Sequence, residues 1–203
     1  MKNIILIFVL ILATKSLSYG SENGNGFILQ LQGGISPAVA QVVDNNLGYG
    51  FDFLVGRSFS PEFTLGLECG YYNFPFKLLN AYGAGRSVIG TIQYPPESHI
   101  PIEVVGQYNL DVGFNLKPYL LLGLGIAFDN FGGTALQTVN GNTTNITQYP
   151  MQFMKYEIEP GLGIACPISN ESNVFVQSKF ELEVRWDDYY IYLPIQFGIN
   201  YKL

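Results

Sequence analysis

Ten charged residues are the first candidates for chemistry, because they occur in segments where apolar residues alternate with polar or small ones. Seven are acidic and three are basic: Asp52, Glu68, Glu103, Lys155, Glu157, Glu159, Lys179, Glu181, Glu183 and Arg185. Side chains at every second position of a strand share one face. If the strands close into a barrel, these side chains would line its lumen, where they could conduct protons or cations or form an interlocking charge network that fills the interior. We expect the network, and its excess of acids leaves room for protonated carboxyls or a bound cation.

Catalysis has a single candidate centre. His99 is the only histidine, and it follows Ser98 and Glu97, which are residue types that hydrolases use. Adjacent strand residues point to opposite faces, so His99 and Ser98 cannot pair as base and nucleophile, and another serine would have to come from a neighbouring loop. We therefore expect a plain rim histidine, no catalytic residues and no enzymatic activity.

The sequence supports metal binding even less than it supports catalysis. One histidine and two widely separated cysteines, Cys69 and Cys166, do not form a familiar metal motif, so no metal site and no cofactor are expected. The cysteines fall on the third and sixth predicted strands, which are not neighbours in an up-and-down barrel. We expect no disulfide, and side chains that face lipid.

Eight segments carry the alternation that would position the charged residues. They span 26–35, 47–56, 63–71, 99–109, 118–128, 153–166, 174–186 and 191–203. The last is the most regular, with Ile195, Phe197 and Ile199 on one face and Gln196 and Gly198 on the other. An apolar period of two residues indicates strands rather than helices.

The connections between these segments alternate between long and short, except for the last one. Long polar loops are predicted at 36–46, 73–98 and 129–152, and the piece 87–94 could continue as a strand beyond the membrane. Short turns on one side and long loops on the other are typical of outer-membrane barrels. A soluble lipocalin-like barrel also has eight strands, but its apolar side chains point inward. Here the residues between the apolar ones are largely Gly, Glu, Gln and Lys, which could not line an apolar calyx.

The start of the chain predicts a secretory signal peptide over residues 1–18. Lys2 precedes an apolar stretch at 4–13, which is too short for a spanning helix, and small residues follow it, so cleavage is expected near 18–20. One barrel domain is then predicted over 21–203. The net charge is −6, and it becomes −8 without the two lysines of the signal. No nucleic-acid partner is expected for a chain this acidic.

Three stretches resemble the small outer-membrane β-barrel domain family of the OmpA and OmpX type: IPIEVVGQYN, KPYLLLGLGIAFD and QFGINYKL. The ending resembles the C-terminal signal that the barrel assembly machinery recognises, through Gln196, Gly198, Tyr201 and Leu203, although the family usually ends in Phe. The resemblance implies an all-β fold, an eight-stranded antiparallel up-and-down transmembrane β-barrel. It implies the outer membrane of a Gram-negative bacterium, with lipid and lipopolysaccharide as surroundings and the assembly machinery as a partner during biogenesis.

We also expect a monomer, and the parity of the strands predicts both chain ends in the periplasm and the long loops outside. The function we expect is non-enzymatic, a structural or surface-interaction role through those loops. The alternative is a small porin-like channel or a transporter of small solutes. The sequence does not name a partner for the loops.

Overall fold

A computed structural model describes residues 26–40, 47–75, 77–82, 88–113, 116–185 and 188–203. The predicted signal peptide lies outside these residues, as does the side chain of Arg185. The described strands are β1 (Phe27–Ala40), β2 (Leu47–Ser58), β3 (Phe63–Phe74), β4 (Lys77–Tyr82), β5 (Val88–Tyr94), β6 (Glu97–Asn109), β7 (Lys117–Val139), β8 (Asn142–Pro167), β9 (Ser172–Lys179), β10 (Glu181–Arg185), β11 (Asp188–Tyr192) and β12 (Ile195–Lys202).

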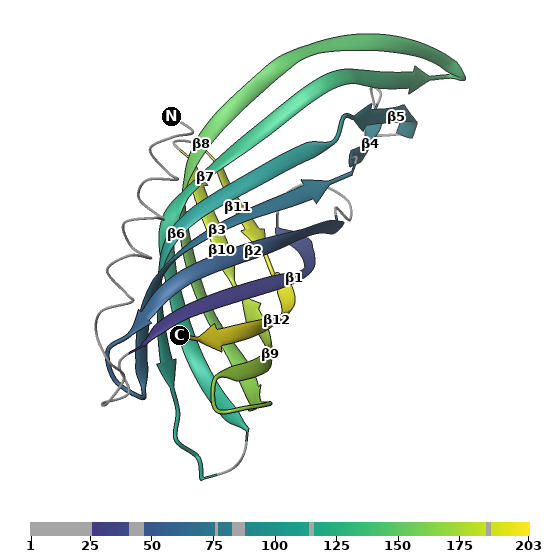
Figure 1. The fold of residues 1–203 in the computed structure, drawn as a ribbon. Helices are drawn as coiled ribbons and strands as arrows, with labels where there is room; N and C mark the ends of the chain where they lie inside the picture. The colour runs from purple at the N-terminus through teal and green to yellow at the C-terminus, as the bar shows by residue number, and fades with distance from the viewer. Residues whose placement is uncertain (1–25, 41–46, 76, 83–87, 114–115, 186–187) are drawn as a thin grey trace.

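The strands close into an eight-stranded antiparallel barrel, which confirms the predicted fold (Figure 1). The wall runs in the order β1, β2, β3, β6, β7 and β8, and then β9 with β10 and β12 with β11 form the last two strands. The barrel closes where β12 pairs with β1, from Ile28↔Lys202 to Ile35↔Ile195. The last strand is interrupted at Pro194, which has no N–H to donate to the ladder.

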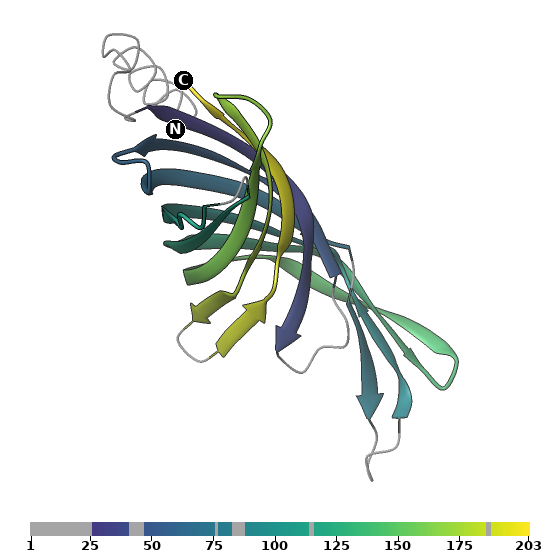
Figure 2. The ribbon, with the colours of Figure 1, turned by 90° about the horizontal axis from the view of Figure 1, so that it is seen from below.

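The two ends of the barrel differ. The turn end carries the short connections 59–62, 110–116 and 168–171 together with Gly26 and Leu203. The hairpin end carries the β4–β5 hairpin and the turn between β7 and β8 (Figure 2). The division into short and long connections is as predicted. The long connections, however, contain strands where loops were predicted.

The prediction of a polar loop at 129–152 is wrong. β7 and β8 stay paired far past the barrel wall, out to Val139↔Asn142. Asn140 and Gly141 close this hairpin with φ values of 51° and 80°, as a tight two-residue hairpin turn requires. The segment is rich in threonine, which favours strands without making them apolar, so the pattern of lipid-facing strands missed it.

The other two predicted loops also contain strand. β1 continues to Ala40 inside the segment predicted as a turn, and residues 41–46 lie outside the described part of the chain. β4 and β5 form a hairpin within 73–98, and β5 pairs with β7 at Gly90↔Val139. The predicted strand at 87–94 agrees with β5. β4, β5 and the outer parts of β7 and β8 thus form a sheet beyond the barrel, which we call the extension sheet (Figures 1 and 2).

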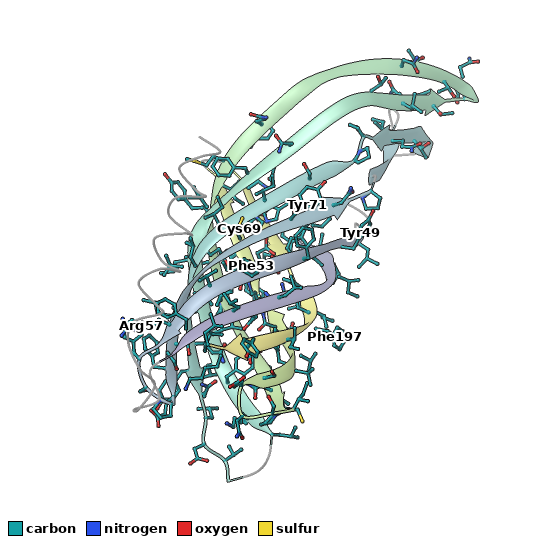
Figure 3. All side chains as sticks on the ribbon, viewed as in Figure 1. Tyr49, Phe53, Arg57, Cys69, Tyr71 and Phe197 are labelled. Atoms are coloured by element: carbon teal, nitrogen blue, oxygen red, sulfur yellow. The ribbon has the colours of Figure 1, made fainter. Side chains whose placement is uncertain are left out.

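The barrel is apolar outside and polar inside. Phe197 is 66% exposed and Leu124 is 52% exposed, whereas Gln32 and Glu68 are each 2% exposed. Figure 3 marks several residues of the outer surface, among them Phe53 and Phe197. A lipocalin-like barrel would show the opposite distribution, so that alternative is excluded. No helix among the described residues is long and apolar enough to cross a membrane.

Both cysteines are free and exposed on this outer surface. Cys69 lies on β3 and Cys166 near the turn end of β8. The expectation that they form no disulfide with each other is therefore confirmed.

An arginine in the middle of the outer surface should be costly, because that surface is built for lipid. Leu124 lies opposite Val104 and Ile158 at mid-wall. We expect Leu124→Arg to lower the free energy of unfolding by about 2 to 4 kcal/mol in lipid vesicles. Ile168→Arg, in the turn at 168–171, should cost about 1 kcal/mol or less. Equal costs at the two sites, measured by urea unfolding, would contradict a lipid-facing wall.

Candidate functional site

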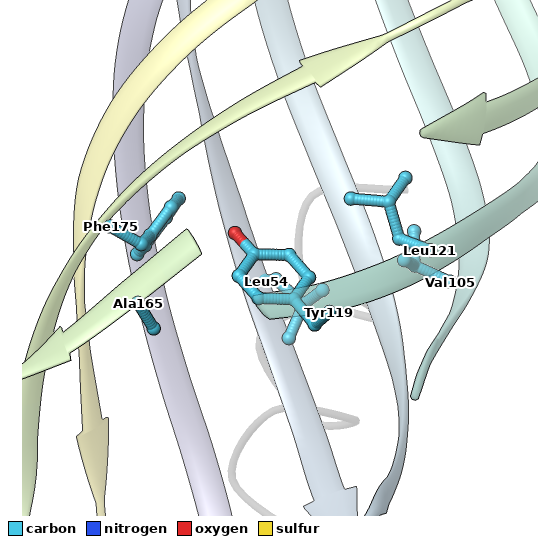
Figure 4. Packing of buried hydrophobic residues seen from close by; sticks show 6 residues of the cluster. All are labelled: Leu54, Val105, Tyr119, Leu121, Ala165 and Phe175. Atoms are coloured by element: carbon cyan, nitrogen blue, oxygen red, sulfur yellow. The ribbon is translucent and has the colours of Figure 1, made fainter. Parts of the chain in front are cut away.

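Side chains fill the barrel in layers along its axis, and an apolar layer is nearest the turn end. It consists of Leu54, Val105, Tyr119, Leu121, Ala165 and Phe175 (Figure 4). The rings of Tyr119 and Phe175 meet edge to face, with centroids 6.5 Å apart. Gly163 leaves room for them, because a Cβ there would lie 2.3 Å from the Tyr119 ring. A cavity of about 510 Å³ opens at the turn end, and its lining includes Leu54 and Ala165 of this layer.

A second group of inward side chains is rich in amides. Its members, which we call the amide cluster, are Gln30, Gln32, Asp52, Tyr72, Gln177 and Gln196. Gln177 donates to Gln32 over 3.0 Å and to Gln196 over 2.7 Å. Gln196 and Tyr72 in turn donate to the carboxylate of Asp52. Strands far apart in the sequence are thereby joined across the lumen.

Lys179 is the centre of the next group, the Lys179 cluster. Its Nζ donates to Glu68 and, over 2.6 Å, to Glu159, and it lies 3.7 Å from Glu103. The four side chains come from β9, β3, β8 and β6, so they tie opposite walls of the barrel together. All four are at least 95% buried. Both oxygens of Glu103 lack a hydrogen-bond partner.

His99 is the centre of a second charged group, the His99 cluster. Its members are His99, Asp129, Lys155, Glu157, Glu181 and Glu183. His99 Nδ1 lies 2.7 Å from Asp129, and its Nε2 lies 3.0 Å from Glu157 and 3.2 Å from Glu181. Lys155 bridges Asp129 and Glu183. Four of these six residues belong to the predicted lumen network, and His99 and Asp129 are additions to it.

The prediction of a rim histidine is therefore wrong, because His99 is 3% exposed and faces the lumen. The sequence did carry the signal, since His99 has the same parity on β6 as Glu103. Asp129 was missed because it was assigned to a loop, although it continues the inward set of β7. Parity within a strand would have found both residues once the strand limits were known.

An aromatic layer covers the His99 cluster toward the hairpin end. Tyr72, Phe74 and Tyr192 form it, with Ala38 packed against them. The rings of Phe74 and Tyr192 lie 5.2 Å apart between centroids. The His99 ring lies 6.2 Å from Tyr72 and 6.3 Å from Tyr192. The charged groups are thus enclosed between apolar side chains on both sides.

Nine of the ten predicted lumen residues are buried inside the barrel, and the tenth is Arg185, whose side chain is not described. Within the described clusters, eight buried acids face two lysines and one histidine. The acids are Asp52, Glu68, Glu103, Asp129, Glu157, Glu159, Glu181 and Glu183. Among these clusters the negative charge exceeds what the basic groups can neutralise. The alternative of a bound cation or protonated carboxyls therefore stays open.

The four residues of the predicted assembly signal divide between the two faces of β12. Gln196 points into the lumen and is 1% exposed, as a member of the amide cluster. Gly198 lies beside the ring of Phe175, which a Cβ would meet at 2.4 Å. Tyr201 and Leu203 are exposed on the outer surface. Their role as an assembly signal stays a prediction.

Comparison with known proteins finds no matching protein-family model and no curated protein similar in sequence. Among solved structures, the chain is similar to Neisserial surface protein A (NspA), at 12% identity and a TM-score of 0.58, over 89% of this chain and 100% of that one. It is also similar to Ail, the attachment invasion locus protein of Yersinia pestis, at 12% identity, a TM-score of 0.48, and 90% and 100% coverage. The likeness to NspA reflects a shared architecture. The chain therefore has the fold of the small eight-stranded outer-membrane β-barrels, as its resemblance to the OmpA and OmpX type predicted.

Proposed function

We propose that this protein is a non-enzymatic outer-membrane barrel that does not conduct and that acts through the extension sheet at its hairpin end. The observation that carries the proposal is the filled lumen. The apolar layer, the two charged clusters and the aromatic layer follow one another along the axis. An eight-stranded barrel is just wide enough for such side chains, and little free cross-section is left for solutes.

The setting we propose is the outer membrane of a Gram-negative bacterium. The apolar outer surface suits contact with lipid and lipopolysaccharide, and the division into short turns and long hairpins suits a periplasmic turn end. The hairpin end then faces the outside. We propose a monomer, delivered by the barrel assembly machinery through its last strand.

The extension sheet supports a surface-interaction role. It places the exposed residues Gly132–Thr134 and Asn140–Asn145 beyond the barrel wall (Figure 2). Among the described strands, residues 142–152 of β8 pair with β7 on one side, and no pairing is present on the other. An open strand edge can pair with an extended segment of another chain, which is a recurring mode of protein recognition.

Electrical recordings distinguish this function from that of a small channel. We expect the refolded protein to give no steady, ion-selective openings in planar bilayers, because packed side chains block the axis. A 16-stranded porin, whose lumen is an aqueous channel, is the positive control for incorporation. Openings that disappear with Glu181→Gln or Lys179→Gln would favour the channel and refute the closed barrel. Without openings, these substitutions should leave the conductance unchanged and change the unfolding midpoint.

A further inference from the structure

Three atoms of the His99 cluster have the spacing of a metal site. His99 Nε2 lies 3.0 Å from Glu157 Oε1 and 3.2 Å from Glu181 Oε1. A zinc ion with bonds of about 2.0 to 2.2 Å in tetrahedral geometry separates its ligand atoms by about 3.3 to 3.6 Å, so these atoms would move apart by a few tenths of an ångström to hold it. One ligand atom from each of His99, Glu157, Glu181 and Glu183 lies within 4.8 Å of the others.

The carboxylate of Glu157 also points to a bound ion. Glu157 is 2% exposed, its Oε2 has no hydrogen-bond partner, and beside its Oε1 lies His99 Nε2, 3.0 Å away. Glu181 Oε1 and His99 Nε2 also lack a partner with hydrogen-bond geometry, although the atoms are close. A buried carboxylate without a partner costs several kcal/mol unless a positive charge neutralises it. When the only ring proton of His99 is on Nδ1, His99 Nε2, Glu157 Oε1 and Glu181 Oε1 are all acceptors and face one another without a donor.

Asp129 holds the imidazole of His99 in the orientation that is usual for metal-bound histidines. His99 Nδ1 lies 2.7 Å from Asp129 Oδ1, so a proton on Nδ1 would be donated to this carboxylate and Nε2 would keep its lone pair. Metal-bound histidines almost always donate their second ring N–H in this way. Lys155 holds Asp129 and Glu183 by ion pairs, which leaves Glu157 and Glu181 as the carboxylates for the ion.

We propose that His99, Glu157 and Glu181 bind one divalent transition-metal ion inside the barrel. An imidazole combined with carboxylates suits zinc and its neighbours in the first row better than calcium or magnesium, which prefer oxygen ligands alone. The remaining carboxylate oxygens or water complete the coordination. The Lys179 cluster is not such a site, because the ammonium group already lies between its carboxylates.

The ion must enter during folding, because every proposed ligand is at most 4% exposed. The test therefore starts from denatured full-length protein, refolded into detergent with Zn²⁺ or with EDTA. After unbound metal is removed, we expect one zinc per folded wild-type chain by elemental analysis. His99→Gln and Glu157→Gln should weaken binding about tenfold or more. Glu68→Gln, which removes an equally buried acid from the Lys179 cluster, is the matched control and should keep the metal.

Stability provides a second readout that separates a metal ligand from a structural acid. With EDTA, Glu157→Gln should raise the unfolding temperature, because it removes one charge from an acid-rich cluster. With Zn²⁺ the order should reverse, because only the wild type gains from the ion. If Glu157→Gln is less stable than wild type in EDTA and zinc has no effect on either chain, the carboxylate is structural and the proposal fails.

X-ray absorption of the loaded wild type needs no variant, so a folding defect cannot obscure it. We expect one nitrogen ligand and oxygen ligands at about 2.0 to 2.2 Å. An all-oxygen shell, folded protein that retains no zinc, or undiminished binding in His99→Gln would each overturn the site. So would Ca²⁺ binding of equal strength that does not depend on His99, since that describes a general attraction of cations to acids.

Discussion

Lys179→Met should destabilise the folded barrel by about 3 to 5 kcal/mol, the usual cost of removing one partner from a buried ion pair. The substitution keeps an unbranched side chain of nearly the same length and removes the ammonium group with its charge and its N–H donors. Glu68 and Glu159 would then remain buried without their ammonium partner, and Glu103 would lose its nearest cation. The measurement is the free energy of unfolding in urea, in vesicles of one lipid composition.

Two variants show whether the effect comes from the ion pairs. Lys117→Met removes an exposed lysine at the turn end and should cost about 0.5 kcal/mol or less. Adding Glu159→Gln to Lys179→Met should recover part of the loss, because the two residues interact directly. A loss below about 1 kcal/mol in Lys179→Met, or no recovery in the double variant, would show that the network does not stabilise the barrel.

The alternation of side chains made the inside of the barrel predictable from the sequence. Glu103 and Lys179 were assigned to the lumen because they lie between apolar neighbours, and a strand has only two faces. Which residues meet inside was not predictable. Lys179 and Glu68 are separated by 111 positions, and their contact depends on the tilt of the strands around the barrel.

At the hairpin end, the alternation of apolar and polar residues did not predict the strands. Beyond the lipid, a strand needs no apolar face, so the Thr-rich part of β7 and β8 looked like a loop. The pair Asn140 and Gly141 was the available signal, since this dipeptide closes tight hairpins. The same error hid Asp129, and with it the orientation of His99. The candidate site around His99 was therefore not predicted, because the strand limits were misplaced.

Gly34→Ala should prevent normal closure of the barrel. Gly34 pairs with Gln196 where β1 meets β12, and a Cβ there would lie 2.0 Å from the backbone oxygen of Ile195. No side-chain rotation relieves a clash with backbone, so the two strands must separate. We expect a loss of more than about 3 kcal/mol, above the 1 to 3 kcal/mol typical of overpacking, or a chain that does not refold.

Gly33→Ala makes the same chemical change one residue away and should have the opposite sign. A Cβ on Gly33 would meet only the Gly50 oxygen, at an ordinary 3.4 Å. Replacing a glycine without strain restricts the unfolded chain and stabilises by about 0.4 to 1 kcal/mol. Refolding yield and unfolding midpoint should therefore fall for Gly34→Ala and hold or rise for Gly33→Ala. Similar refolding yields and unfolding midpoints for the two variants would mean that β1 and β12 do not pair in this register. The barrel would then close in a different way.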